Sequence, residues 1–127
     1  MEQERMANVL IIDDDASVRE MLRLVLETSG CRVQTAVDGA DALQQLTTPT
    51  YHPDLILLDL NMPIMTGWEF RYQQRQIQAI ADIPVAVISA DRSLAQQPFS
   101  IDAIDYFRKP LDFERLLALV SRVCRTA

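Results

Sequence analysis

The segment from Asp54 to Pro63 limits the choice of fold more than any other stretch of this 127-residue chain. Four apolar residues, Leu55 to Leu58, follow one another without a polar interruption, which is typical of a strand covered on both faces. The run ends at Asp59, and Pro63 cannot continue a strand because it lacks the amide hydrogen that pairing needs. A carboxylate therefore stands where a buried strand ends, and ligands of parallel α/β sheets bind at that edge. The alternative is that Asp59 only caps the strand.

Four further strands are predicted from short runs of apolar or mixed residues: 9–12, 31–37, 85–88 and 104–108. Residues 31–37 are the more polar run, which indicates an edge strand. Apolar residues with helical spacing predict three helices, which lie within residues 16–29, 39–46 and 113–124. Strands that alternate with helices predict an α/β fold with a parallel sheet.

Two other segments have helical propensity but a weaker pattern. After Gly67 the apolar stripe is poor, and Pro98 interrupts a predicted helix over 94–103. At the start of the first helix, Ser17 with Glu20 fits a capping box, and Asp15 is an alternative N-cap.

Composition excludes several classes of protein. The net charge of −6 argues against a nucleic-acid surface, which needs clustered Lys and Arg. No apolar run is long enough to span a membrane or to act as a signal peptide. Cys31 and Cys124 are far apart and have no further ligand at metal-binding spacing, so we expect reduced thiols in a cytoplasmic protein. The length predicts a single domain, residues 1–127, and the predicted strands and helices leave no room for a second one.

Polar residues follow four of the predicted strands: Asp13 and Asp14, then Asp59, Ser89 and Lys109. In a parallel sheet these positions meet at one edge, where three carboxylates would repel one another. A Mg²⁺ ion relieves this repulsion, since it is held by carboxylates, water and phosphate; Mn²⁺ is an expected substitute. Asp59 is then a candidate nucleophile for phosphoryl transfer. Mg²⁺ and Lys109 would neutralise charge on the transferring group, and the Ser89 hydroxyl would donate to it.

These motifs together resemble the receiver domain of two-component response regulators, and the resemblance covers residues 7–125. The matching residues are Asp13-Asp14, Asp59 within LILLDLNMP, Ser89-Ala90 and Lys109-Pro110. The resemblance implies a flavodoxin-like, doubly wound five-stranded parallel sheet with strand order 2-1-3-4-5. It also implies a phosphoprotein that receives its phosphoryl group on Asp59 from a sensor histidine kinase or a histidine phosphotransfer protein.

The same resemblance implies how the metal is held. Asp14 binds Mg²⁺ directly, Asp13 acts mostly through water, and Asn61 contributes its backbone carbonyl. Asp59 completes the metal set while it accepts the phosphoryl group.

Further roles follow from the resemblance on the opposite side of the site. Ser89 and Lys109 contact the phosphoryl oxygens, and Tyr106 is the switch aromatic that turns inward when Ser89 engages the phosphate. The Lys109-Pro110 bond is cis in the family. Asn61 and Asp91 flank the path of the attacking water and tune hydrolysis; both are small and polar, so we expect a short-lived aspartyl phosphate.

The chain departs from the family pattern between the fourth and fifth strands. Asp102 replaces the usual Gly, Pro98 lies inside the expected helix, and the interval is about two residues short. We therefore predict a short or irregular fourth helix within residues 91–102 that is mobile and reorganises on activation.

Two other classes of protein share some of these features but require residues that this chain lacks. A Mg²⁺-dependent phosphohydrolase of the haloacid-dehalogenase type needs an Asp two residues after its nucleophile, where this chain has Asn61. A flavodoxin needs a phosphate loop after the first strand, where Asp13 to Asp15 would repel phosphate. The prediction is a signalling switch and not an enzyme, apart from self-directed phosphotransfer and autodephosphorylation. It would act by binding an unidentified downstream protein or by passing the phosphoryl group on.

Overall fold

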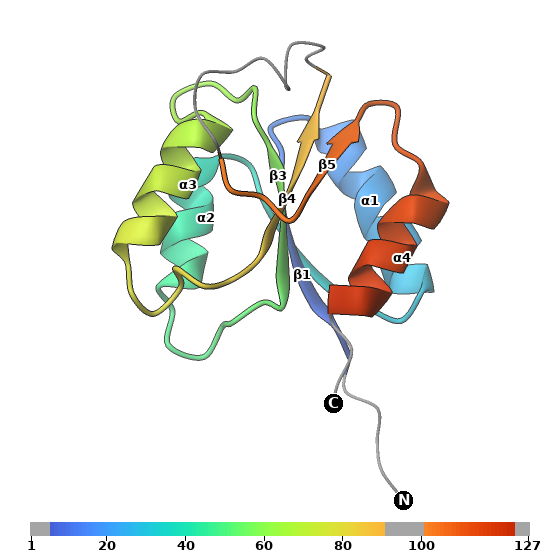
Figure 1. Cartoon of the computed structure of the whole chain (residues 1–127), viewed down its shortest axis with the longest axis horizontal. Coiled ribbons are helices and arrows are strands. Elements are labelled where there is room, and N and C mark those ends of the chain that lie inside the picture. Colours follow the sequence, from blue (N-terminus) through green and yellow to red (C-terminus); the bar gives the residue numbers. More distant parts are fainter. Residues whose placement is uncertain (1–5, 91–100, 124–127) are drawn as a thin grey trace, which may run out of the picture.

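Five parallel strands form one sheet in the order β2-β1-β3-β4-β5 (Figure 1). This computed structural model describes residues 6–90 and 101–123. The strands are β1 (Asn8–Ile12), β2 (Arg32–Ala36), β3 (Leu55–Asp59), β4 (Val85–Ser89) and β5 (Asp105–Arg108). The predicted flavodoxin-like strand order is confirmed, and the polar run that was expected at an edge is the edge strand β2.

Helices cover both faces of the sheet. They are α1 (Ala16–Thr28), α2 (Gly39–Leu46), α3 (Gly67–Gln76) and α4 (Phe113–Val123). Figure 1 shows α1 and α4 on one face and α2 and α3 on the other. Among the described residues, no helix is both long and apolar enough to cross a bilayer.

The central strands supply both hydrophobic cores because successive side chains of a strand point to opposite faces. In β3, Ile56 and Leu58 pack under α2 and α3, whereas Leu55 and Leu57 pack under α1 and α4. Every residue of β3 and β4 is buried. The uninterrupted apolar runs of the sequence therefore correspond to strands with helices on both sides.

The start of α1 corrects one local prediction. The N-cap is Asp15, whose carboxylate accepts hydrogen bonds from the backbone N–H groups of Ser17 at 2.8 Å and Val18 at 3.4 Å. The capping box proposed for Ser17 and Glu20 is wrong because Asp15 already takes the first free N–H groups of the helix.

In the segment between β4 and β5, the structure describes Ala90 and residues 101–104. Asp91, Pro98 and most of the predicted irregular fourth helix lie outside the described residues, as does Cys124. Asp102 has a φ of 56°, which lies in the left-handed region. Asp adopts this conformation less readily than the Gly it replaces.

Candidate functional site

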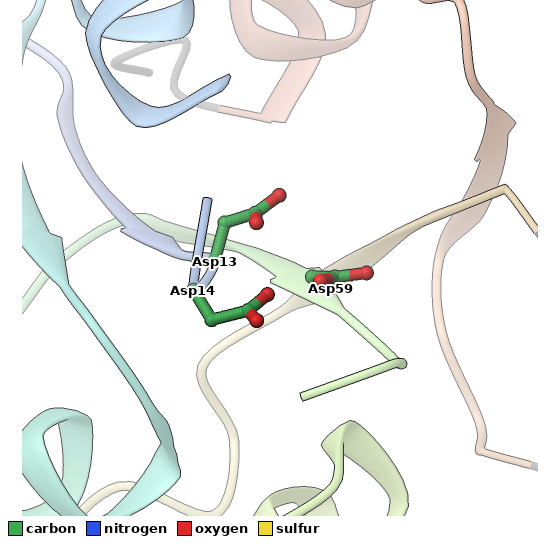
Figure 2. A group of neighbouring side chains, drawn as sticks. All are labelled: Asp13, Asp14 and Asp59. Atoms are coloured by element: carbon green, nitrogen blue, oxygen red, sulfur yellow. The ribbon is translucent and has the colours of Figure 1, made fainter. Parts of the chain in front are cut away.

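Two neighbouring strands bring three carboxylates to the carboxyl edge of the sheet. Asp59 is the last residue of β3, and Asp13 directly follows β1, whose Ile12 pairs with Leu58. Asp13 and Asp59 are 1% and 4% exposed, whereas Asp14 is exposed. Figure 2 shows the three side chains turned toward a shared space. One carboxylate oxygen from each residue lies within 4.8 Å of the others.

This arrangement has the donor chemistry of a hard divalent cation. Oxygen ligands are the ones Mg²⁺ prefers, and it is commonly bound through one or two carboxylates with waters completing the shell. Three carboxylates with two of them buried would otherwise hold a concentrated, poorly solvated negative charge. The residues present therefore fit the metal that the sequence predicted.

Lys109 is the cation that the fold supplies to this site. Its Nζ lies 3.2 Å from Asp13 Oδ2 and 3.8 Å from Asp59 Oδ1. The backbone N–H of Lys109 donates to the carbonyl of Ser89 at 3.0 Å, and the Lys109-Pro110 bond is cis. β5 and β4 together thus place one ammonium between two carboxylates.

Asp13 is held in place on several sides. Lys109 Nζ approaches one carboxylate oxygen, and the backbone N–H of Asp15 donates to the other at 2.9 Å. Arg19 Nη1 donates to the Asp13 carbonyl at 2.8 Å. Because these groups occupy Asp13, the exposed Asp14 is the better placed of the pair for direct contact with a metal ion.

Burial and neighbouring charge set the ionisation of Asp59. Desolvation by burial, with the nearby charge of Asp13 as the second cause, raises the pKa of the Asp59 carboxyl to about 6. Lys109 and the hydrogen bond from the Asn61 backbone N–H, 3.3 Å from Oδ1, act in the opposite direction. At neutral pH the carboxylate is mostly ionised, as a nucleophile must be. Burial makes this ionised form less stable than it would be in water.

The loop after Asp59 is fixed by the first turn of α3. Thr66 and Glu69 form a capping box, in which each side chain accepts a hydrogen bond from the other residue's backbone N–H. This box was not predicted, although Thr66 and Glu69 have the spacing that defines it. The Gly67 N–H donates to the Leu60 carbonyl at 3.0 Å, which attaches the helix directly to the end of β3.

The remaining predicted site residues differ in their surroundings. Ser89 ends β4 and is fully buried, one residue beyond Ile88, which pairs with Asp59. Tyr106 lies on the edge strand β5, pairs with Val87 and is 40% exposed. Asp91, the second predicted hydrolysis-tuning residue, lies outside the described residues.

Comparisons with known proteins identify relatives over nearly the whole chain. Residues 9–121 match the response regulator receiver domain. The chain is 38% identical over 122 residues to the DNA-binding dual master transcriptional regulator RpaA of Synechocystis, and 39% identical over 119 residues to the transcriptional regulatory protein PrrA of Mycobacterium tuberculosis. The matches cover 94% and 92% of this chain. They cover 50% and 49% of the relatives, so the chain spans about half their length.

Two solved structures are similar to this protein over nearly the whole chain. The chemotaxis response regulator CheY4 of Vibrio cholerae has a TM-score of 0.82 and 33% identity, with 94% of this chain and 99% of that chain covered. The response regulator TrrA of Thermotoga maritima, solved in complex with Mg²⁺ and BeF, has a TM-score of 0.81 and 27% identity, with 93% and 99% covered.

Proposed function

Because this chain belongs to the response regulator receiver domain family, we propose that Asp59 is its phosphoacceptor and that the domain is a phosphorylation-dependent switch. The observation that carries the assignment is the position of Asp59. It ends the central strand, is almost fully buried, and lies within reach of both an acidic pair and a lysine. The family is one of signalling modules and not of conventional enzymes.

The proposed chemistry is a transfer between a phosphohistidine and Asp59. An Asp59 oxygen attacks phosphorus, the phosphorus–nitrogen bond breaks, and its electron pair returns to the imidazole. Lys109 offers positive charge to the phosphoryl oxygens, and the Ser89 hydroxyl donates a hydrogen bond to them. A bound Mg²⁺ neutralises charge on the transferring group. Asp14 would hold the metal directly, with Asp13 mostly through water and the Asn61 carbonyl and Asp59 completing the set; Mn²⁺ would bind in the same way.

Incubation with acetyl phosphate and Mg²⁺ tests this assignment. We expect one phosphoryl group per chain by intact mass, and none on the Asp59→Asn variant, which keeps the size of the side chain but removes the nucleophile. Peptide mapping should place the label on Asp59. Labelling that persists in Asp59→Asn, or that proceeds equally well in EDTA, contradicts the mechanism.

The metal site gives a second prediction. Asp14→Asn should weaken Mg²⁺ binding by about tenfold or more, because it removes the anionic ligand that the other residues leave exposed. Isothermal titration calorimetry with Mg²⁺ measures this directly. Asp15→Asn is the matched control, since the Asp15 carboxylate is occupied by the N-cap of α1. Equal losses of Mg²⁺ affinity in both variants would indicate a general effect of negative charge and no defined metal site.

Hydrolysis gives a third prediction. Asn61 is exposed two residues after Asp59, so the aspartyl phosphate should be open to water. Replacing Asn61 by Met should lengthen the half-life of the phosphoprotein several-fold by obstructing the water's path. The decay of the phosphorylated mass after removal of acetyl phosphate measures it. An unchanged half-life would remove Asn61 from this role, which we also propose for Asp91.

Membership of the family indicates the classes of partner. We propose a histidine kinase or a histidine phosphotransfer protein as donor, an unidentified downstream protein as receiver of the signal, and a cytoplasmic location. The Synechocystis relative is a DNA-binding regulator, and this chain matches half of its length. The net charge of −6 argues against a nucleic-acid surface on these residues. A switch through Ser89 and Tyr106, and autodephosphorylation, belong to the same proposal.

A further inference from the structure

Helix α3 buries polar side chains where an apolar stripe is expected. Its buried positions are Gly67, Phe70, Arg71 and Gln74, which have the spacing of one helix face. Arg71 is 8% exposed and Gln74 is fully buried. Polar groups persist at such positions when their hydrogen bonds are made inside the protein.

The two side chains join separate parts of the backbone. Arg71 donates from Nε to the Ile101 carbonyl at 3.1 Å and from Nη2 to the Asp102 carbonyl at 2.9 Å. Its Nη1 donates to Gln74 Oε1 at 2.8 Å. Gln74 Nε2 donates to the carbonyls of Ile80 at 2.9 Å and Ile83 at 3.1 Å. This set of contacts, the Arg71 network, connects the segment before β5 with the segment before β4.

The first residue of α3 touches the proposed phosphoacceptor. A Cβ atom added to Gly67 would lie 2.6 Å from the Asp59 carbonyl oxygen and 2.8 Å from Leu60 Cα. The helix therefore packs against the backbone of Asp59 at its start and holds the entry of β5 one turn later. In Figure 1 the chain that leads into β5 begins beside α3 and then crosses to the sheet.

The surroundings of the Arg71 guanidinium indicate that its role is to fix the position of the neighbouring backbone. Its guanidinium is surrounded by carbonyl and amide oxygens, while the Asp102 carboxylate pairs with Arg75 Nη1 at 2.6 Å. Burial lowers the pKa of Arg71, and the charge of Arg75 lowers it further. A buried cation is a poor source of stability compared with an apolar side chain. What the planar guanidinium provides is a fixed, directional attachment to two successive carbonyls.

We propose that Arg71 is a positioning residue that couples the Asp59 site to β5, so that α3 and residues 101–102 move as one body when Asp59 is modified. The inference rests on the proposed function of Asp59. It adds a route from Asp59 through Gly67, α3 and Arg71 to the start of the strand that carries Tyr106. The carbonyl of Asp102, a residue with left-handed backbone, accepts the hydrogen bond that attaches it to Arg71.

Backbone amide NMR with Mg²⁺ and beryllofluoride, which stands in for the phosphoryl group, tests the coupling. In the wild-type chain, amides of residues 59–62 and of 101–106 should both shift. In Arg71→Met, the shifts at 59–62 should remain, and those at 101–106 should fall by about twofold or more because the attachment is lost. Undiminished shifts at 101–106 in Arg71→Met would overturn the proposal.

Two further variants separate the attachment from charge and from stability. Arg71→Lys keeps the positive charge but cannot hold two carbonyls with a planar fork, so it should lose the shifts at 101–106 as Arg71→Met does. Arg75→Gln removes the exposed ion pair with Asp102 and should retain them. Shifts at 101–106 that remain in Arg71→Lys and are lost in Arg75→Gln would overturn the role of the Arg71 network.

The same spectra separate the two proposals. If the wild-type amides at 59–62 do not respond to beryllofluoride, the proposed function of Asp59 fails. If they respond and the Arg71 variants match the wild type, only the coupling fails.

Discussion

Replacing Asp59 by asparagine is expected to raise the free energy of unfolding at pH 7, without divalent metal, by about 2–3 kcal/mol. The folded protein holds this carboxyl in a buried position beside Asp13, which raises its pKa from 3.8 to about 6. The folded state therefore binds the Asp59 proton more tightly than the unfolded state does. Below about pH 4 both states are protonated and no stability is lost, whereas stability falls as the pH rises through 6.

Urea unfolding between pH 4 and pH 8 in EDTA measures this gain. The advantage of Asp59→Asn should be largest above pH 6 and should disappear near pH 4, where the wild-type carboxyl is neutral as well. Asp82→Asn, at an exposed position, is the control and should change stability little at any pH. Added Mg²⁺ should favour the wild type, because a cation bound to the folded state offsets the repulsion. A gain that is independent of pH would mean that titration of Asp59 is not its cause.

Replacing Gly67 by alanine is expected to lower the free energy of unfolding by about 1–3 kcal/mol. The new Cβ would meet the Asp59 carbonyl oxygen at 2.6 Å and Leu60 Cα at 2.8 Å. Both are backbone atoms, one at the end of the buried strand β3 and one in the residue after it, and backbone cannot rotate away as a side chain can. The helix would have to shift from the phosphoacceptor, so acetyl phosphate labelling should also slow.

Gly39 provides a matched control within the same fold. It also begins a helix and is buried, but its added Cβ would meet Met65 Sδ at 2.5 Å and Cγ at 2.9 Å. A methionine side chain can change rotamer to make room. Phe70 Cβ, 3.2 Å from the added atom, needs to move by a few tenths of an ångström, so Gly39→Ala should cost less than Gly67→Ala in urea unfolding and should leave labelling unchanged. Equal losses for the two alanine variants would show that contact with the Asp59 backbone is not what requires Gly67.

Much of the architecture could be predicted from local pattern. The runs at 9–12, 55–58 and 85–88 are apolar without interruption, and a strand that is covered on both faces requires this. The carboxylates that end two of these runs had to meet, because the carboxyl ends of parallel strands share one edge. The structure places Asp13, Asp14 and Asp59 together at that edge. Their roles in metal binding and phosphoryl transfer are still predictions.

The sequence by itself determined the parallel sheet and the gathering of acidic residues, because each follows from residues a few positions apart or from strand ends that share one edge. The strand order was implied by the resemblance to the receiver family and is confirmed by the fold. Tertiary structure decided which carboxylates are buried, and therefore that Asp59 has a raised pKa while Asp14 faces solvent. It also decided the buried face of α3. Arg71 and Gln74 read as solvent-facing residues in any periodic pattern, because such patterns assume that polar side chains point outward. Their partners are carbonyls six to thirty-one residues away, and only the folded chain brings those acceptors to the helix.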